Sequence, residues 1–103
     1  MTKQYKVIVS ECSKEMLAQH IKFLADYDMD AARKVKVKLI EAFSSLKAMP
    51  NRYPFFEEEF IPPNKYHKMF VENWYLVLFQ IKDNIVYIDY VLDCRQDYSW
   101  LMR

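Results

Sequence analysis

The residues best suited to phosphate chemistry lie in two short segments of the second half of the chain. Lys65, His67 and Lys68 fall within four residues, and Arg95 and Tyr98 follow about thirty residues later. A histidine can accept or donate a proton near neutral pH because its ordinary pKa is about 6.5. The planar fork of an arginine matches two phosphate oxygens, and lysines add positive charge. These residue types are suited to binding a phosphodiester.

Each of these residues also has an ordinary structural explanation. Arg95 has Asp93 and Asp97 as close carboxylate neighbours in the sequence, so an ion pair is the alternative to a phosphate contact. A lone strand histidine such as His67 is more often structural, and surface lysines are usually only solvated. The aromatic Tyr98 lies beside further apolar residues that could hold the C-terminal segment against the core.

The composition excludes several classes of function. The chain has 103 residues and no glycine. Phosphate-binding loops, dinucleotide-binding fingerprints and nucleophile elbows all need glycine, so these ATPase, oxidoreductase and hydrolase sites are excluded. Cys12 and Cys94 have no metal-ligand spacing, and we expect two buried reduced thiols, no metal and no cofactor. The length predicts a single domain over residues 1–103.

The near-neutral net charge of +1 hides a local excess of basic residues. Residues 31–56, which include Arg52, carry six basic side chains against one acid, Glu41. Such a surface can attract a polyanion, although a solvated lysine face of a helix is the plain alternative. The sequence has no secretory signal and no apolar run of membrane-spanning length, which predicts a soluble cytoplasmic protein with no membrane partner.

The first half of the chain predicts a strand and two helices. In residues 5–9, Lys6 alternates with apolar neighbours, and the segment is rich in β-branched residues, as in a strand. Helical spacing then runs from Lys14 to about Tyr27, with Ser13 as its expected N-cap, and Asp30 is expected to cap a second helix that ends before Pro50. Apolar residues recur every three or four positions in the second helix and form one stripe along it: Ala32, Val35, Leu39, Phe43 and Leu46.

The second half predicts a proline-rich loop and three strands, at residues 65–71, 74–81 and 85–92. Glu72-Asn73 and Asp83-Asn84 separate them as tight turns. Strand alternation places Lys65 and His67 on one face and Lys68 on the other. The order β-α-α-β-β-β predicts a two-layer α+β domain, in which a helical hairpin covers one face of an antiparallel meander joined by the first strand. The other face would then be open.

The element order and four short segments resemble the RelE/ParE superfamily of toxins. The segments are MPNRYP at residues 49–54, YHKMFV at 66–71, NWYLVLFQI at 73–81 and VLDCRQDY at 91–98. The resemblance spans nearly the whole chain and implies the toxin of a type II toxin–antitoxin pair. Its implied partner is a cognate antitoxin protein that wraps over the hairpin and the sheet.

The resemblance leaves two targets open, because a shared fold does not fix a function. RelE-like toxins cut mRNA in the ribosomal A site, an endoribonuclease activity, and this is our first expectation. The cleavage activates a 2′-hydroxyl and needs cations, a base and an acid. Arg95 aligns with the family arginine on the last strand and would contact phosphate, while His67 and Tyr98 would transfer protons or stack. Lys65, Lys68 and Arg52 would hold the RNA backbone.

One departure from the pattern favours the alternatives. Nuclease-like relatives carry an arginine directly after the tyrosine of the central strand, and this chain has Leu76 after Tyr75. Fewer cations would then surround a scissile phosphate. The departure favours the hypothesis of a ParE-like toxin, which inhibits DNA gyrase through protein contact and cuts nothing. It also favours a third hypothesis, a degenerate toxin that retains only antitoxin binding.

Overall fold

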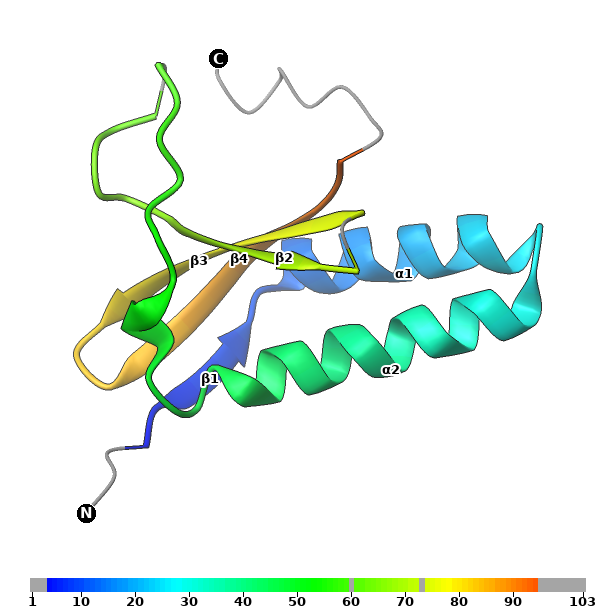
Figure 1. Cartoon of the computed structure of the whole chain (residues 1–103), viewed down its shortest axis with the longest axis horizontal. Coiled ribbons are helices and arrows are strands. Elements are labelled where there is room, and N and C mark those ends of the chain that lie inside the picture. The colour runs from blue at the N-terminus through cyan, green and yellow to red at the C-terminus, as the bar shows by residue number, and fades with distance from the viewer. Residues whose placement is uncertain (1–3, 60, 73, 95–103) are drawn as a thin grey trace.

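The computed structural model describes residues 4–59, 61–72 and 74–94, in which a four-stranded sheet packs against two antiparallel helices (Figure 1). The elements are β1 (Lys6–Val9), α1 (Glu11–Ala25), α2 (Met29–Ser45), a 3₁₀ turn η1 (Pro50–Arg52), β2 (His67–Val71), β3 (Tyr75–Lys82) and β4 (Ile85–Asp93). The order β-α-α-β-β-β and the α+β class expected from the sequence are confirmed.

The first helix begins three residues earlier than its sequence pattern indicated. Ser10 is the N-cap, and its Oγ accepts a hydrogen bond from the Ser13 backbone N–H at 3.0 Å. The expected cap, Ser13, is instead fully buried and donates its hydroxyl to the Ile88 carbonyl at 3.0 Å. The Ser10 hydroxyl and backbone bind β4 as well. The prediction of Ser13 was wrong because its hydroxyl satisfies a strand carbonyl, which the sequence alone does not reveal.

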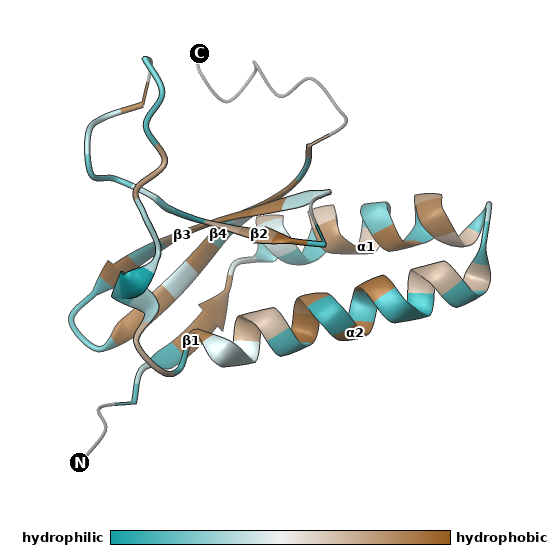
Figure 2. Ribbon diagram, in the orientation of Figure 1, coloured by the Kyte–Doolittle hydropathy of each residue, from teal (hydrophilic) through white to brown (hydrophobic). Residues whose placement is uncertain are grey.

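The second helix buries the stripe that its spacing predicted. Asp28, rather than the expected Asp30, is the N-cap and accepts hydrogen bonds from the backbone N–H groups of residues 30 and 31. Figure 2 shows hydrophobic and hydrophilic residues alternating along α2. All five stripe residues are buried, with Leu39 and Leu46 fully inaccessible. Packing of this stripe on the sheet therefore fixes the rotation of α2 about its axis.

The sheet has the strand order β1-β4-β3-β2. β1 pairs in parallel with β4, and the other neighbours are antiparallel. The two hairpin turns fall where Glu72 and Asp83 adopt positive φ angles of 55° and 57°. Phe79 pairs with Ile88 and Leu78 with Tyr90, so Asp89 is an extra residue on β4, a β-bulge. β2 is the outer strand on the side of α2.

Both faces of the sheet are covered in part, which corrects the expectation that one would be open. The helix-facing core includes Leu39, Val77, Phe79 and Ile88, all fully buried. A second cluster on the opposite face consists of Phe56, Tyr66, Leu76, Leu78 and Leu92. The loop between η1 and β2 contributes Phe56 and Tyr66 to this cluster. The proline-rich segment is therefore part of the core and not only a surface connection.

Candidate functional site

A polar cluster lies on the face of the sheet opposite the helices, beside the β-bulge. The Gln80 side-chain amide donates a hydrogen bond to the Asp89 carboxylate at 2.6 Å. The rings of Tyr66 and Tyr90 meet edge to face, with centroids 5.9 Å apart and an interplanar angle of 73°. Lys65 places its ammonium 5.3 Å from the centre of the Tyr66 ring. We call Tyr66, Gln80, Asp89 and Tyr90 the bulge cluster.

The electrostatics of the bulge cluster are set by burial and by one carboxylate. Burial, together with the nearby Asp89 and Tyr90, raises the pKa of Tyr66 to about 12. Ile88 faces the helices, so Asp89 points to the opposite face by ordinary alternation and there accepts the hydrogen bond from Gln80. The bulge places the next residue, Tyr90, on this same face. The cluster thus holds hydroxyl and amide donors around a negative charge, an arrangement that disfavours a second anion.

The raised pKa of Tyr66 predicts a loss of stability in alkali. The phenol is favoured in its neutral form in the folded chain, so its contribution is complete below pH 10. Stability should fall as the pH rises from 10 toward 12 and Tyr66 ionises in the unfolded chain first. Urea unfolding of Tyr66→Phe should show a shallower decline over this range than the wild type. Equal slopes for the two proteins would contradict the assigned pKa.

His67 is held on the other face of the sheet. It is 8% exposed and lies between two rings, with centroid distances of 4.3 Å to Phe55 and 5.3 Å to Phe79. Its Nδ1 lies 2.8 Å from the Tyr53 carbonyl oxygen, so Nδ1 carries the proton and donates. The ring therefore joins the segment before β2 to the central strand.

Arg52 contacts the side chain of Tyr53, the residue whose backbone carbonyl accepts from His67. The Arg52 guanidinium donates to the Tyr53 hydroxyl at 3.2 Å. The guanidinium carbon Cζ lies 5.1 Å from the centre of the Tyr53 ring. Lys68 is half-buried on the opposite face, as strand alternation predicted, and Lys65 precedes β2. Arg52 and His67 therefore share Tyr53 as a partner, at its side chain and its backbone carbonyl, whereas Lys68 lies on the other face of the sheet.

The remaining candidates, Arg95 and Tyr98, lie outside the described residues. Sequence reasoning also missed Gln80, Asp89 and Tyr90 as a group. Their positions on neighbouring strands were a signal, since β3 and β4 form a hairpin. The bulge that brings Tyr90 to the same face as Asp89 left no signal in the sequence pattern.

The other histidine, His20, has a structural position. Its Nε2 donates to the Val91 carbonyl at 2.7 Å, and its ring lies 5.5 Å from that of Tyr75. Both cysteines are free thiols; Cys12 is exposed, against expectation, and Cys94 is half-buried. Across residues 4–59, 61–72 and 74–94, no three His, Cys, Asp or Glu side chains gather as metal ligands. In the same ranges no helix has the length and apolar character to span a membrane.

Comparisons with known proteins place the fold. No protein-family model matches the chain, and no curated protein matches it. Among solved structures, the chain is similar to one from a structure titled "Chromosomal ParDE TA system from P. aeruginosa", with a TM-score of 0.73 and 14% sequence identity. The alignment covers 89% of this chain and 98% of that chain. The chain therefore has the fold of a component of that ParDE structure. This confirms the fold that the resemblance of its sequence segments implied.

Proposed function

We propose that this chain is the toxin of a type II toxin–antitoxin pair, acting as one domain in the cytoplasm and held inactive by a cognate antitoxin. The observation that carries the proposal is the fold shared with a ParDE component over 89% of this chain and 98% of that one. The four family-like segments in the sequence support the same assignment.

For the mode of action, the geometry favours contact inhibition of a protein target, with DNA gyrase as the candidate that ParE resemblance implies. His67 is buried between rings on the helix-facing side, while Lys68 lies on the opposite side. The bulge cluster centres on the carboxylate of Asp89. A phosphorane needs converging cations and a free proton-transfer group. The described candidates do not meet these needs together.

Ribosome-dependent mRNA cleavage is the second candidate, and one observation favours it. Lys65, Tyr66 and Tyr90 combine an ammonium with aromatic rings on the face of the sheet opposite the helices. Such a pairing of cation and ring suits single-stranded RNA, whose bases stack on aromatic side chains. In this mode Arg95 would contact the scissile phosphate, and Tyr98 would stack or donate a proton.

Two reactions with the same purified protein distinguish the modes. The first measures supercoiling by gyrase, and the second maps cuts in a defined mRNA by primer extension during reconstituted translation. We expect inhibited supercoiling and intact mRNA. Cuts that require the ribosome and fall in its A site would replace contact inhibition with cleavage. Inactivity in both reactions, by folded protein free of antitoxin, would overturn the toxin assignment and leave a binding module.

Arg95→Ala gives a prediction within the toxin itself. Loss of a group that stabilises transition-state charge lowers a catalytic rate by about 100- to 1000-fold. Contact inhibition predicts a change of less than about tenfold, equivalent to about 1.4 kcal/mol of binding free energy. Growth arrest on induction and the half-inhibitory concentration for supercoiling measure the effect, with Arg52→Ala as a second arginine control. Abolished arrest in a folded Arg95→Ala protein would support catalysis.

A further inference from the structure

The two helices form a groove where they lie side by side (Figure 1), and we call it the hairpin groove. Its lining comes from both helices: Lys14, Leu17, Ala18, Ile21 and Lys22 from α1, and Lys36 from α2. Ala18 and the three lysines are exposed, so the groove opens to solvent. Its volume of about 400 Å³ falls within the range of about 300–1,000 Å³ that is usual for small-ligand sites.

The floor of the hairpin groove is apolar. Leu17 and Ile21 are one helical turn apart on α1 and therefore share a face. Both are half-buried, because they pack against the main core and still border the groove. The methyl group of Ala18 beside them leaves free the space that a longer side chain would occupy. The groove therefore offers an apolar bed for a hydrocarbon chain.

Three ammonium groups surround this floor, and within the described chain no carboxylate lines it. The ammonium group of Lys14 lies 3.2 Å from the Glu11 carboxylate, but both side chains of this pair are exposed, so it holds Lys14 only weakly. In the part of the chain that the structure describes, no carboxylate lies within salt-bridge distance of Lys22 or Lys36. The groove therefore combines an apolar floor with positive charge that the chain itself does not neutralise.

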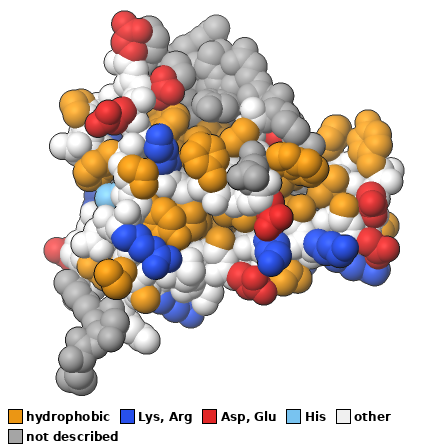
Figure 3. Space-filling model, viewed as in Figure 1, with side chains coloured by type: hydrophobic (Ala, Val, Ile, Leu, Met, Phe, Trp, Pro, Cys, Tyr) orange, Lys and Arg blue, Asp and Glu red, His pale blue; other side chains and the backbone are white. Residues whose placement is uncertain are grey.

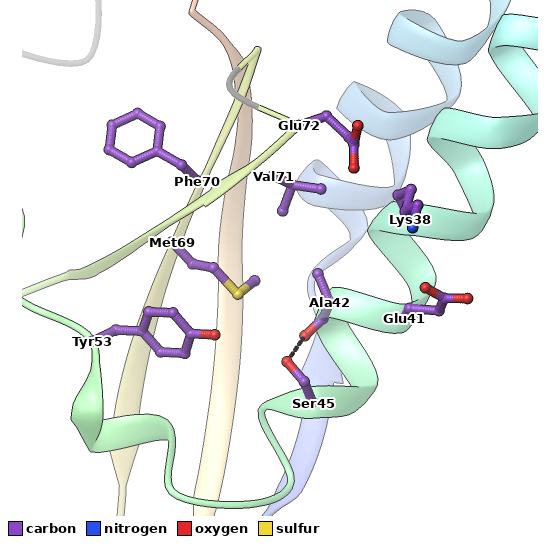
Figure 4. Close-up of a pocket in the computed structure, with 9 residues that line it drawn as sticks. All are labelled: Lys38, Glu41, Ala42, Ser45, Tyr53, Met69, Phe70, Val71 and Glu72. Atoms are coloured by element: carbon purple, nitrogen blue, oxygen red, sulfur yellow. Dashed lines mark hydrogen bonds between the residues drawn. The ribbon is translucent and has the colours of Figure 1, made fainter.

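Another groove shows that this charge pattern is not general for the chain. It lies between α2 and β2, where Ala42 and Met69 contribute to its lining (Figure 4). Glu41 and Glu72 border it together with Lys38, so carboxylates outnumber ammonium groups there. On the face seen in Figure 3, acidic and basic side chains likewise stand together over α2. An anion would be repelled by the carboxylates of that groove and attracted by the lysines of the hairpin groove.

The positions of the lysines indicate where an anionic head group would lie. The helices are antiparallel and joined at residues 26–28, so Lys36 lies roughly opposite Ala18. Lys14 and Lys22 are separated by two turns of α1, about 12 Å along the helix axis. Lys36 therefore stands between them on the facing helix. A head group between Lys22 and Lys36 leaves the floor toward Lys14 for a chain.

We propose that the hairpin groove binds a soluble single-chain anionic amphiphile, a fatty-acid carboxylate of medium chain length. Its carboxylate accepts hydrogen bonds from the ammonium groups of Lys22 and Lys36, and its alkyl chain lies over Leu17 toward Lys14. Positive charge selects the anion, and the apolar floor selects the chain. Because the head group contacts both helices, the bound ligand also ties α1 to α2. The site uses neither the bulge cluster nor Arg95, so the inference does not rest on the proposed toxin function.

Isothermal titration calorimetry of the full-length protein with decanoate, below its micellar concentration, tests the proposal. Decyltrimethylammonium has the same chain with a cationic head, and acetate has the carboxylate alone. Of these three compounds, we expect only decanoate to bind. In the series hexanoate, octanoate and decanoate, each added methylene should strengthen binding by about two- to fourfold. Equal binding of the cationic amphiphile, or an affinity independent of chain length, would overturn the proposal.

Two further measurements test for a different occupant of the same surface. Co-sedimentation with vesicles of phosphatidylglycerol and phosphatidylcholine tests an anionic membrane surface, and sedimentation velocity tests a second copy of the chain. We expect a monomer that binds decanoate and stays in the supernatant when the vesicles sediment. Protein that binds the vesicles but not decanoate, or a dimer that excludes decanoate, would overturn the proposal.

Two matched double variants test the head-group site. Lys22→Gln combined with Lys36→Gln removes both charges at the carboxylate and should weaken decanoate binding by about tenfold. Lys34→Gln combined with Lys38→Gln is the control, because it removes two exposed charges of α2 outside the hairpin groove. We expect the control to bind like the wild type. Equal weakening of both proteins would show attraction by net charge alone and contradict the assigned site.

Ala18→Phe tests the apolar floor separately. Ala18 is exposed, so the ring fits on the helix surface and fills the groove, which should weaken decanoate binding by at least tenfold. Val37→Phe, at an exposed position outside the lining, should bind like the wild type. Thermal unfolding confirms that both variants are folded. Unchanged affinity of Ala18→Phe would exclude the groove. A protein that arrests growth but binds no decanoate would overturn this inference alone, and a decanoate-binding protein without toxicity would overturn the proposed function alone.

Discussion

Phe79→Ala should lower the free energy of unfolding by about 3–5 kcal/mol, the usual cost of removing a fully buried aromatic side chain. Phe79 is completely inaccessible in the central strand β3. Its ring stacks on His67 at 5.3 Å and meets Tyr53 edge to face at 5.9 Å. The substitution would therefore open a cavity in the core and remove the support of the loop before β2. Urea unfolding followed by circular dichroism measures the change.

Phe70→Ala is the matched control for this prediction. Phe70 belongs to the neighbouring strand, carries the same side chain and is 57% exposed. Its truncation should change the free energy of unfolding by no more than about 0.5 kcal/mol. Similar losses for both variants would show that burial in the structure does not determine stability at these positions.

His67→Phe should lower the free energy of unfolding by about 1–3 kcal/mol and leave growth arrest intact at a temperature where the variant is folded. Phenylalanine preserves the ring contacts with Phe55 and Phe79 but cannot donate to the Tyr53 carbonyl. The half-buried Tyr53 carbonyl would lose its hydrogen-bond donor, which accounts for the cost. Thermal unfolding and growth curves after induction test the two parts of the prediction.

The two readouts separate a structural role of His67 from a catalytic one. His67→Asn provides a polar comparison, because its side-chain amide can donate to the Tyr53 carbonyl but cannot exchange a proton near neutral pH. A structural histidine predicts that both variants arrest growth. Loss of arrest in both, with folding retained, would instead assign proton transfer to His67 and revive mRNA cleavage as the mode of action.

The local patterns of the sequence predicted most of the elements, because each has a periodicity of its own. The apolar stripe of α2 identified five buried residues, from Ala32 to Leu46. Apolar residues at helical spacing form one face of the helix, and this face packs against the core. The hairpin turns at Glu72 and Asp83 were also found, and a positive φ occurs at Glu72, a residue type that the sequence argument did not expect there. Boundaries shifted by a few residues at Ser10 and Asp28, where the caps depend on competing hydrogen bonds.

The faces of the central strand could not be read in the same way. Residues 75–79 are all buried, so β3 shows no alternation between polar and apolar positions. Such a run indicates burial on both sides but does not say what covers each side. Phe79 faces the helices, and Leu78 faces the opposite side. The loop after η1 covers this second side with Phe56 and Tyr66, which the sequence pattern does not reveal.

The sequence by itself determined the class of fold, the element order and the residue types available for phosphate chemistry. Only the tertiary structure decided which of these residues meet. It placed His67 between Phe55 and Phe79, brought Tyr90 to the same face as Asp89 at a bulge, and set Ala42 and Met69 along one groove. Periodicity reports on neighbours within one element, whereas these contacts depend on register and packing between elements distant in the sequence.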